Sequence, residues 1–264
     1  MLKISVLAIT QADSTALAHL QREIDILPTY GARVELADKR FKSKPRSLFE
    51  RVRDALEISC GDLVRCGYCE DSCADEVEHV WPKAFFPNKT FLPNNYLFAC
   101  GRCNPTKGNK FAIWSGAGWV DLKERRKTHG YIQPPAALSK FIDPVFENPL
   151  DLIWLDIAGG SFRFTEINAK GTKEYDRANF TIETLRLNKE VLVRSRRNAY
   201  SGFVDRINMY IQRKIAGDNH VLLRNRLVEL RRAPHQTVRF EMARQLPMLG
   251  LVAGIDVDYP ELFL

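Results

Sequence analysis

Apolar residues in the first sixty positions recur mainly at helical spacing. This spacing predicts one helix over 13–26 and a second over 48–56. Two short apolar runs, Ile4 to Ile9 and Val34 to Leu36, are predicted as strands. The basic, proline-containing segment 40–46 is predicted as a linker. The N-terminal part is therefore expected to be mainly helical.

The pattern changes after residue 60 and becomes helical again near residue 181. Segment 114–135 is rich in Gly, Trp and Pro and predicts irregular structure. Two apolar runs, 152–157 and 161–167, flank a Gly-Gly pair and predict a β-hairpin. From Thr181 onward the apolar spacing predicts successive helices, and Pro234 ends one of them. One helical stripe there consists of Phe203, Ile207, Tyr210 and Ile211.

These patterns predict an α+β protein in four parts. They are an N-terminal α/β segment (1–59), a cysteine-rich module (60–112), an irregular region with a hairpin (113–180) and a helical C-terminal part (181–264). The chain has 264 residues, of which 45% are hydrophobic and 27% charged, and this excludes a disordered or collagen-like protein. No apolar run approaches the roughly 18 residues of a membrane span, and polar residues interrupt the N-terminal run. We therefore expect a cytoplasmic protein without a membrane partner.

The positive charge is concentrated in the C-terminal part. The whole chain carries +7, yet residues 181–246 alone contain fourteen Lys and Arg against six Asp and Glu. The remainder holds 25 basic and 26 acidic residues and is nearly neutral. Such an asymmetry is typical of a protein that binds phosphate groups, although a solvated helical surface gives the same pattern.

The six cysteines include two C-x-x-C pairs, Cys66 with Cys69 and Cys100 with Cys103. Each pair can present two thiolates to one ion, and two pairs complete the tetrahedral set of sulfurs that structural Zn²⁺ prefers. A disulfide scaffold or a redox dithiol does not explain two such pairs. Cys60 and Cys73 are expected to be buried apolar residues, with Cys73 a less regular alternative ligand.

Polar residues between and after the cysteine pairs suggest catalytic chemistry. Glu78 and Asn104 offer the carboxylate and amide oxygens that Mg²⁺ or Mn²⁺ prefers over thiolates. His79 has the side chain whose ordinary pKa suits proton abstraction near neutrality. A Glu-His pair is more often structural, and its place between two metal knuckles is what favours catalysis here.

The order C-x-x-C, Glu-His-x-x-Pro, Asn-x-Leu, C-x-x-C-Asn-x-x-Lys-Gly resembles the HNH endonucleases over about residues 66–110. The resemblance implies a zinc-stapled ββα-metal module with a treble-clef-like fold. It places His79, Asn95 and Asn104 at the three motif positions, with Asn95 holding the histidine-bearing loop. It further implies metal-dependent hydrolysis of phosphodiester bonds, DNA favoured, that leaves 5′-phosphate and 3′-hydroxyl ends.

Further motifs resemble the PtuB-type HNH proteins of retron and Septu antiphage systems. They include Ile142-Asp143-Pro144 and the segment 181–189, where Asn188-Lys189 stands in place of the commoner Asn-Arg. This resemblance implies a bacterial antiviral defence role and an ATPase partner. The stripe that contains Phe203 would then be part of a docking face, whereas the ordinary alternative is that it packs inside its own domain.

Five basic residues are predicted to contact nucleic-acid phosphates: Lys107, Lys110, Arg194, Arg196 and Arg197. Two other functions remain open on this evidence. The chain could be a non-catalytic zinc module that binds nucleic acid, or an RNase-type toxin that uses the same site on RNA.

Overall fold

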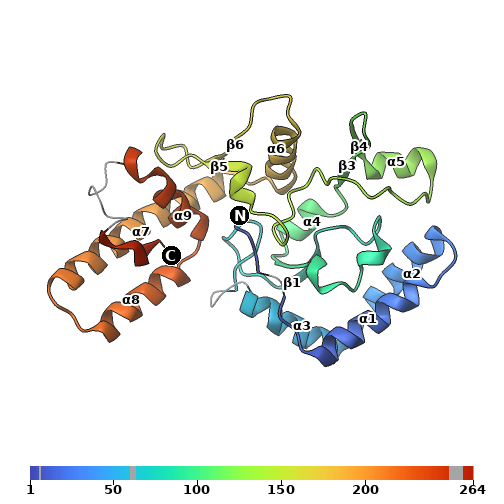
Figure 1. Cartoon of the computed structure of the whole chain (residues 1–264), viewed down its shortest axis with the longest axis horizontal. Helices are drawn as coiled ribbons and strands as arrows, with labels where there is room; N and C mark the ends of the chain where they lie inside the picture. The colour runs from blue at the N-terminus through green and yellow to red at the C-terminus, as the bar shows by residue number, and fades with distance from the viewer. Residues whose placement is uncertain (6, 60–63, 250–257, 264) are drawn as a thin grey trace.

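The computed structural model describes residues 1–5, 7–59, 64–249 and 258–263, and it has the predicted α+β character. Within the described residues, the strands form three separate two-stranded antiparallel sheets. Figure 1 shows the cysteine-rich module in the middle of an elongated molecule, with the N-terminal helices at one end and the C-terminal helices at the other. None of the described helices combines the length and apolarity that crossing a membrane requires.

Three helices form the N-terminal part: α1 (Gln11–Asp25), α2 (Tyr30–Lys42) and α3 (Arg46–Ser59). Thr10 and Thr29 cap the first two through their side-chain oxygens. The strand predicted at Val34 to Leu36 is wrong, because these residues lie inside α2. The predicted linker is shorter than expected and spans 43–45. The described residues of the other predicted strand, Ile4 to Ile9, are also outside any strand.

The central module consists of a β-hairpin followed by a short helix. Strands β1 (Glu76–His79) and β2 (Tyr96–Ala99) pair with Glu76 opposite Ala99 and His79 opposite Tyr96, and α4 (Cys103–Lys107) follows. Side chains alternate between the two faces of a strand. Leu97 and Ala99 accordingly pack in the main core, whereas Tyr96 and Phe98 pack against α1 and α3.

The region 113–180 is more regular than its sequence predicts. The strands β3 (Ala112–Trp114) and β4 (Trp119–Asp121) form a second hairpin, and α5 (Leu122–His129) follows directly. The hairpin predicted over 152–157 and 161–167 is confirmed, with β5 (Ile153–Leu155) paired to β6 (Phe164–Glu166). Five short 3-10 turns complete the described elements: η1 (Pro87–Lys89), η2 (Pro93–Asn95), η3 (Pro149–Asp151), η4 (Leu246–Met248) and η5 (Pro260–Leu262).

The helices predicted in the C-terminal part are confirmed, although the first begins earlier than Thr181. They are α6 (Lys173–Leu185), α7 (Glu190–Ile215), α8 (His220–Arg232) and α9 (Gln236–Gln245). On α7, Phe203, Ile207 and Tyr210 are buried in the main core. The stripe therefore packs inside its own domain, and the expected docking face is not formed by these residues.

Candidate metal centre and active site

The four cysteines of the two C-x-x-C pairs converge as predicted. Their sulfur atoms all lie within 4.8 Å of one another. Four thiolates around one zinc ion, with bonds of about 2.3 Å, place the sulfurs roughly 3.8 Å apart, so this donor set fits structural zinc. Hydrogen bonds among these sulfurs lower the pKa of Cys100 and raise the pKa of Cys66 and Cys103.

Local backbone contacts hold the two knuckles together. The first lies in the loop before β1, where Gly67 N donates to Phe98 O of β2 at 2.9 Å. The second begins where β2 ends, and Cys103 is the first residue of α4. Zinc at this position would tie the loop, the hairpin and α4 to each other. Cys73 is exposed and outside the cluster, so its predicted burial is wrong, and Cys60 lies outside the described residues.

His79 is the last residue of β1, and its side chain is oriented by one hydrogen bond. Its Nε2 lies 2.9 Å from the carbonyl oxygen of Thr90. Since a carbonyl can only accept, Nε2 must carry the proton, which leaves Nδ1 as a proton acceptor. Burial and the charges of Lys83, Lys107 and Lys44 together lower the pKa of His79 to about 3, although the hydrogen bond to Thr90 O opposes this shift. The imidazole is therefore neutral at pH 7.

Aromatic rings surround His79 on the side of the hairpin that faces the N-terminal helices. The ring of Phe41, at the end of α2, lies 4.5 Å from the imidazole centroid, and the ring of Tyr96 lies 5.4 Å from it. Only 6% of His79 is exposed to solvent. Phe41 therefore covers the imidazole in this structure.

Asn95 holds the loop that connects β1 to β2. Its Oδ1 accepts from Trp81 N at 2.8 Å, and its Nδ2 donates to Trp81 O at 3.0 Å and to Lys89 O at 2.9 Å. The side chain is only 2% exposed. Because Thr90 belongs to the same loop, these bonds fix the carbonyl that orients His79. Asn95 is thus placed to position the imidazole and does not itself contact it among the described bonds.

Glu78 forms an ion pair with Lys107, a partner that the sequence did not suggest. Its Oε1 accepts from Lys107 Nζ at 2.6 Å, and Lys107 also donates to His79 O at 2.9 Å. Burial raises the pKa of Glu78, and the ammonium of Lys107 limits that rise. A carboxylate already paired with a buried cation is a poor ligand for a second cation. This pairing disfavours Glu78 as a ligand for Mg²⁺ or Mn²⁺.

Asn104 pairs instead with Glu76, which the sequence analysis did not select. Asn104 Nδ2 donates to Glu76 Oε2 at 2.7 Å, and both side chains are half-buried. They line one side of a groove of about 560 Å³. The alternation of a strand places Glu76 on the same face as Glu78, which is the sequence signal that could have identified it.

Two of the five predicted phosphate contacts are corrected by burial. Lys107 is 0% exposed and Arg196 is 3% exposed, so neither side chain can reach a nucleic acid. Lys107 is held by Glu78, and Arg196 donates to the carbonyls of Leu187 and Leu192. Lys110, Arg194 and Arg197 are exposed and remain available to phosphates.

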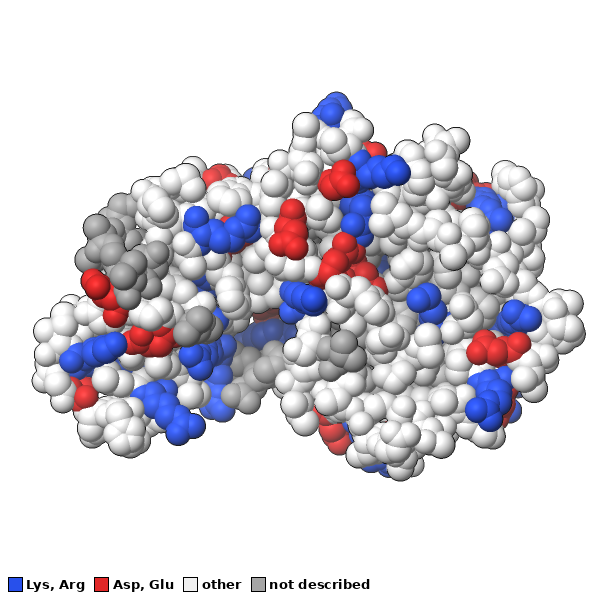
Figure 2. Space-filling model, viewed as in Figure 1, with Lys and Arg blue, Asp and Glu red and all other residues white. Residues whose placement is uncertain are grey.

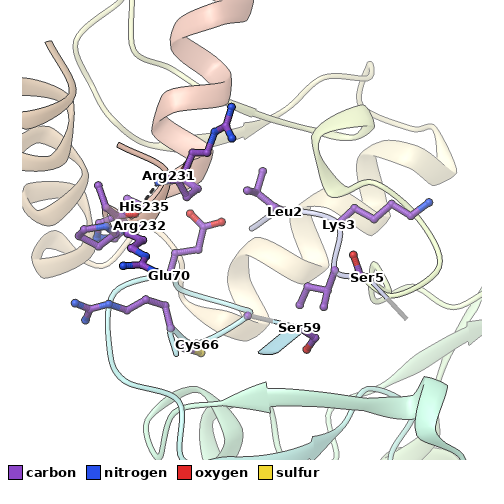
Figure 3. Close-up of a pocket in the computed structure, with 15 residues that line it drawn as sticks. Leu2, Lys3, Ser5, Ser59, Cys66, Glu70, Arg231, Arg232 and His235 are labelled. Atoms are coloured by element: carbon purple, nitrogen blue, oxygen red, sulfur yellow. Dashed lines mark hydrogen bonds between the residues drawn. The ribbon is translucent and has the colours of Figure 1, made fainter. Parts of the chain in front are cut away.

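A second hollow, of about 230 Å³, lies where the cysteine-rich module meets the C-terminal helices (Figure 3). The Glu70 carboxylate lies in it and accepts from Thr237 N at 3.0 Å and from Thr237 Oγ1 at 2.7 Å. His235 Nε2 lies 3.2 Å from Asp71 Oδ1 across the same junction. These contacts attach the first knuckle to α9.

Comparison of the chain with protein-family models, curated proteins and solved structures finds no match.

Proposed function

We propose that this chain is an HNH-type endonuclease that hydrolyses phosphodiester bonds of nucleic acids, with DNA favoured. The observation that carries the proposal is the environment of His79. A neutral imidazole has its Nε2 proton committed to Thr90 O, so Nδ1 is its proton acceptor. The hairpin that bears it lies between two cysteine pairs whose spacing and motif order resemble the HNH family.

In this mechanism His79 takes a proton from water as the water oxygen attacks phosphorus. The new P–O bond forms in line with the bond to the 3′ oxygen, which breaks, and the leaving oxygen takes a proton from solvent. A 5′-phosphate and a 3′-hydroxyl result. Phe41 covers the imidazole, so this ring has to move before His79 reaches the substrate.

The half-buried oxygens of Glu76 and Asn104 are of the type that suits a hard divalent cation. Mg²⁺ or Mn²⁺ held there would stabilise negative charge that develops on the phosphate. Zinc bound by Cys66, Cys69, Cys100 and Cys103 would have a structural role.

The test compares the parent protein with His79→Gln, which keeps the side-chain volume closer to that of histidine than alanine would. Plasmid DNA and structured RNA are each incubated with Mg²⁺, Mn²⁺ or EDTA. Loss of a general base should reduce cleavage by about 10²-fold to 10⁴-fold, with zinc content and melting temperature little changed. The matched control is His19→Gln, because His19 lies on α1 and its side chain is 72% exposed. Equal cleavage by parent and His79→Gln would refute the catalytic role.

The second candidate is a zinc module that binds nucleic acid without cutting it. The burial of His79 and the Lys107–Glu78 pair are the observations that favour it. It predicts DNA binding that is independent of Mg²⁺ and no cleavage by any variant. Cleavage of RNA alone would instead favour the RNase-type toxin.

The PtuB-type resemblance extends the proposal to antiviral defence, with this chain as the effector and an ATPase as its partner. The stripe that contains Phe203 is buried and is not available to a partner. The surface of α7 and α8 that a partner can contact includes three exposed apolar residues, Met209, Val221 and Leu222. Affinity purification from the native host, followed by mass spectrometry, checks this part. Recovery of the chain alone, active and harmless to the cell, would contradict it.

A further inference from the structure

A groove runs between the corner joining α2 to α3 and the β1–α4 side of the central module. Its N-terminal wall carries four cations, Lys42, Lys44, Arg46 and Arg53, and its opposite wall carries Glu76 and Asn104. The sequence predicts no function for these four cations, which form the basic wall: Lys42, Lys44 and Arg46 lie in the predicted linker 40–46, and Arg53 lies in the helix predicted over 48–56.

The cations of this wall are weakly committed to other groups. Lys42 pairs with Asp38 at 2.6 Å and Arg46 with Glu50 at 2.9 Å, and both pairs are largely exposed. Exposed ion pairs of this kind contribute little free energy, so a phosphate can replace the carboxylate at small cost. Arg53 donates to the backbone carbonyl of Asp75, which leaves its charge uncompensated by that contact.

Lys44 is the central cation of the wall. Its Nζ donates to Phe41 O at 3.2 Å and lies 4.4 Å from the centroid of the Phe41 ring and 5.3 Å from that of Phe49. Within the described part of the chain, no carboxylate forms an ion pair with it. Partial burial lowers the pKa of Lys44, and the charges of Arg53 and Lys83 lower it further. An anion in the groove would relieve this repulsion.

The two walls together distinguish between classes of anion. Glu50, Asp75 and Glu76 also line the groove and repel any anion that lies against them, so the occupant has to keep its charges on the basic wall, which the irregularly spaced carboxylates of an acidic peptide do not. A phosphodiester backbone places its charges at regular intervals along a strand, so it can follow the basic wall while the oxygens of Glu76 and Asn104 face a cation. Phe41 lines the groove and also contacts His79. Its ring therefore lies between a backbone bound in the groove and the imidazole.

We propose that this groove binds the substrate backbone, with Lys42, Lys44, Arg46 and Arg53 as its phosphate contacts. The inference rests on the proposed function, since it identifies the surface that brings nucleic acid to His79. It adds an N-terminal binding surface to the basic C-terminal helices.

The test measures binding without cleavage. Fluorescence anisotropy with a labelled 20-nucleotide DNA, single-stranded and duplex, is recorded without added Mg²⁺ or Mn²⁺ over a range of salt concentrations. The variant Lys44→Gln/Arg46→Gln should bind more weakly. For duplex DNA, each lost contact should reduce the slope of log affinity against log salt by about 0.9, and for single strands by about 0.7.

The matched control is Arg22→Gln/Lys39→Gln, which removes the same charge from exposed positions of α1 and α2 outside the groove. Arg46→Gln alone serves as a second variant, because the Arg46 side chain is 93% exposed and its loss cannot disturb the fold. This single variant should lose about half of the effect of the double variant.

The outcomes separate this inference from the proposed function. Equal salt slopes for the parent and both groove variants would overturn the groove, even if the parent cleaves DNA. An equal loss in the control would also overturn it, as would a parent that does not bind DNA at all. A parent that binds through the groove but cleaves nothing would leave the groove standing and refute the nuclease.

Discussion

The ion pair with Lys107 determines how readily the Glu78 carboxylate can bind another cation. The ion pair between them is buried on both sides, with side-chain exposures of 0% and 7%. The pair spans 29 positions of the chain, so it depends on how α4 folds back onto β1. A motif shows that a glutamate and a lysine are both present, but it does not show that one neutralises the other. This is why the sequence analysis assigned Glu78 to a metal and Lys107 to a phosphate.

The Lys107→Met variant should be strongly destabilised. Removing one partner leaves a buried charge uncompensated, and such losses amount to about 3–5 kcal/mol of unfolding free energy. Urea unfolding with zinc present measures the change. The matched control is Lys110→Met, because Lys110 is exposed and its ammonium contacts only Thr106 O among the described residues.

The double variant Lys107→Met/Glu78→Met separates the charge from the packing. With both charges removed, stability should return to near that of the parent, because apolar replacements of buried pairs are often neutral. If Lys107→Met were as stable as Lys110→Met, the buried ion pair would have no structural role.

At the scale of elements, apolar periodicity predicted the helices whose buried face consists of regularly spaced apolar residues. The helix α3 buries Leu48, Val52 and Leu56, and these are the residues that predicted it. By contrast, α5 buries only Leu122, so it has no apolar periodicity to detect. Its start nevertheless carries a readable signal, because Asp121 caps the helix and Glu124 follows three positions later.

The local pattern also explains why the strand predicted at Val34 to Leu36 is wrong. The apolar-polar alternation of Val34 to Leu36 is typical of a strand, but its neighbours belong to a helix capped by Thr29. The spacing of the cysteines, in contrast, has few structural solutions, so it predicted their convergence correctly.

The hairpin and α4 should depend on the four-cysteine cluster. Replacing Cys100 by serine should lower the zinc content below about one per chain and reduce the melting temperature, because metal binding and folding are coupled in such modules. Cys73→Ser is the matched control, since Cys73 is exposed and outside the cluster. Elemental analysis and thermal unfolding measure both properties. A zinc-free protein with the melting curve of the parent would contradict the zinc centre.

At the scale of the whole molecule, charge is distributed over two distant surfaces. Figure 2 shows Lys and Arg side chains gathered over the C-terminal helices at the left of this face. Of the residues selected there from the sequence, Arg194 and Arg197 are exposed on α7, whereas Arg196 is buried. The groove adds a second basic surface on the N-terminal side. Composition predicted the first surface only, because the acidic residues of segment 1–59 offset most of its basic residues.

Charge reversal on α7 should weaken binding to every DNA sequence by the same factor. Arg194→Glu/Arg197→Glu removes two contacts that are expected to reach phosphates and no base, so the salt slope should fall by about 2 for duplex DNA.

If one DNA molecule contacts both surfaces, combining this variant with Lys44→Gln/Arg46→Gln should add the two changes in log affinity, since distant sites are nearly independent. Anisotropy with several unrelated sequences measures both effects. Altered sequence preference with an unchanged salt slope would contradict a backbone-tracking surface. A combined variant no weaker than the groove variant alone would show that the C-terminal helices lie outside the DNA path.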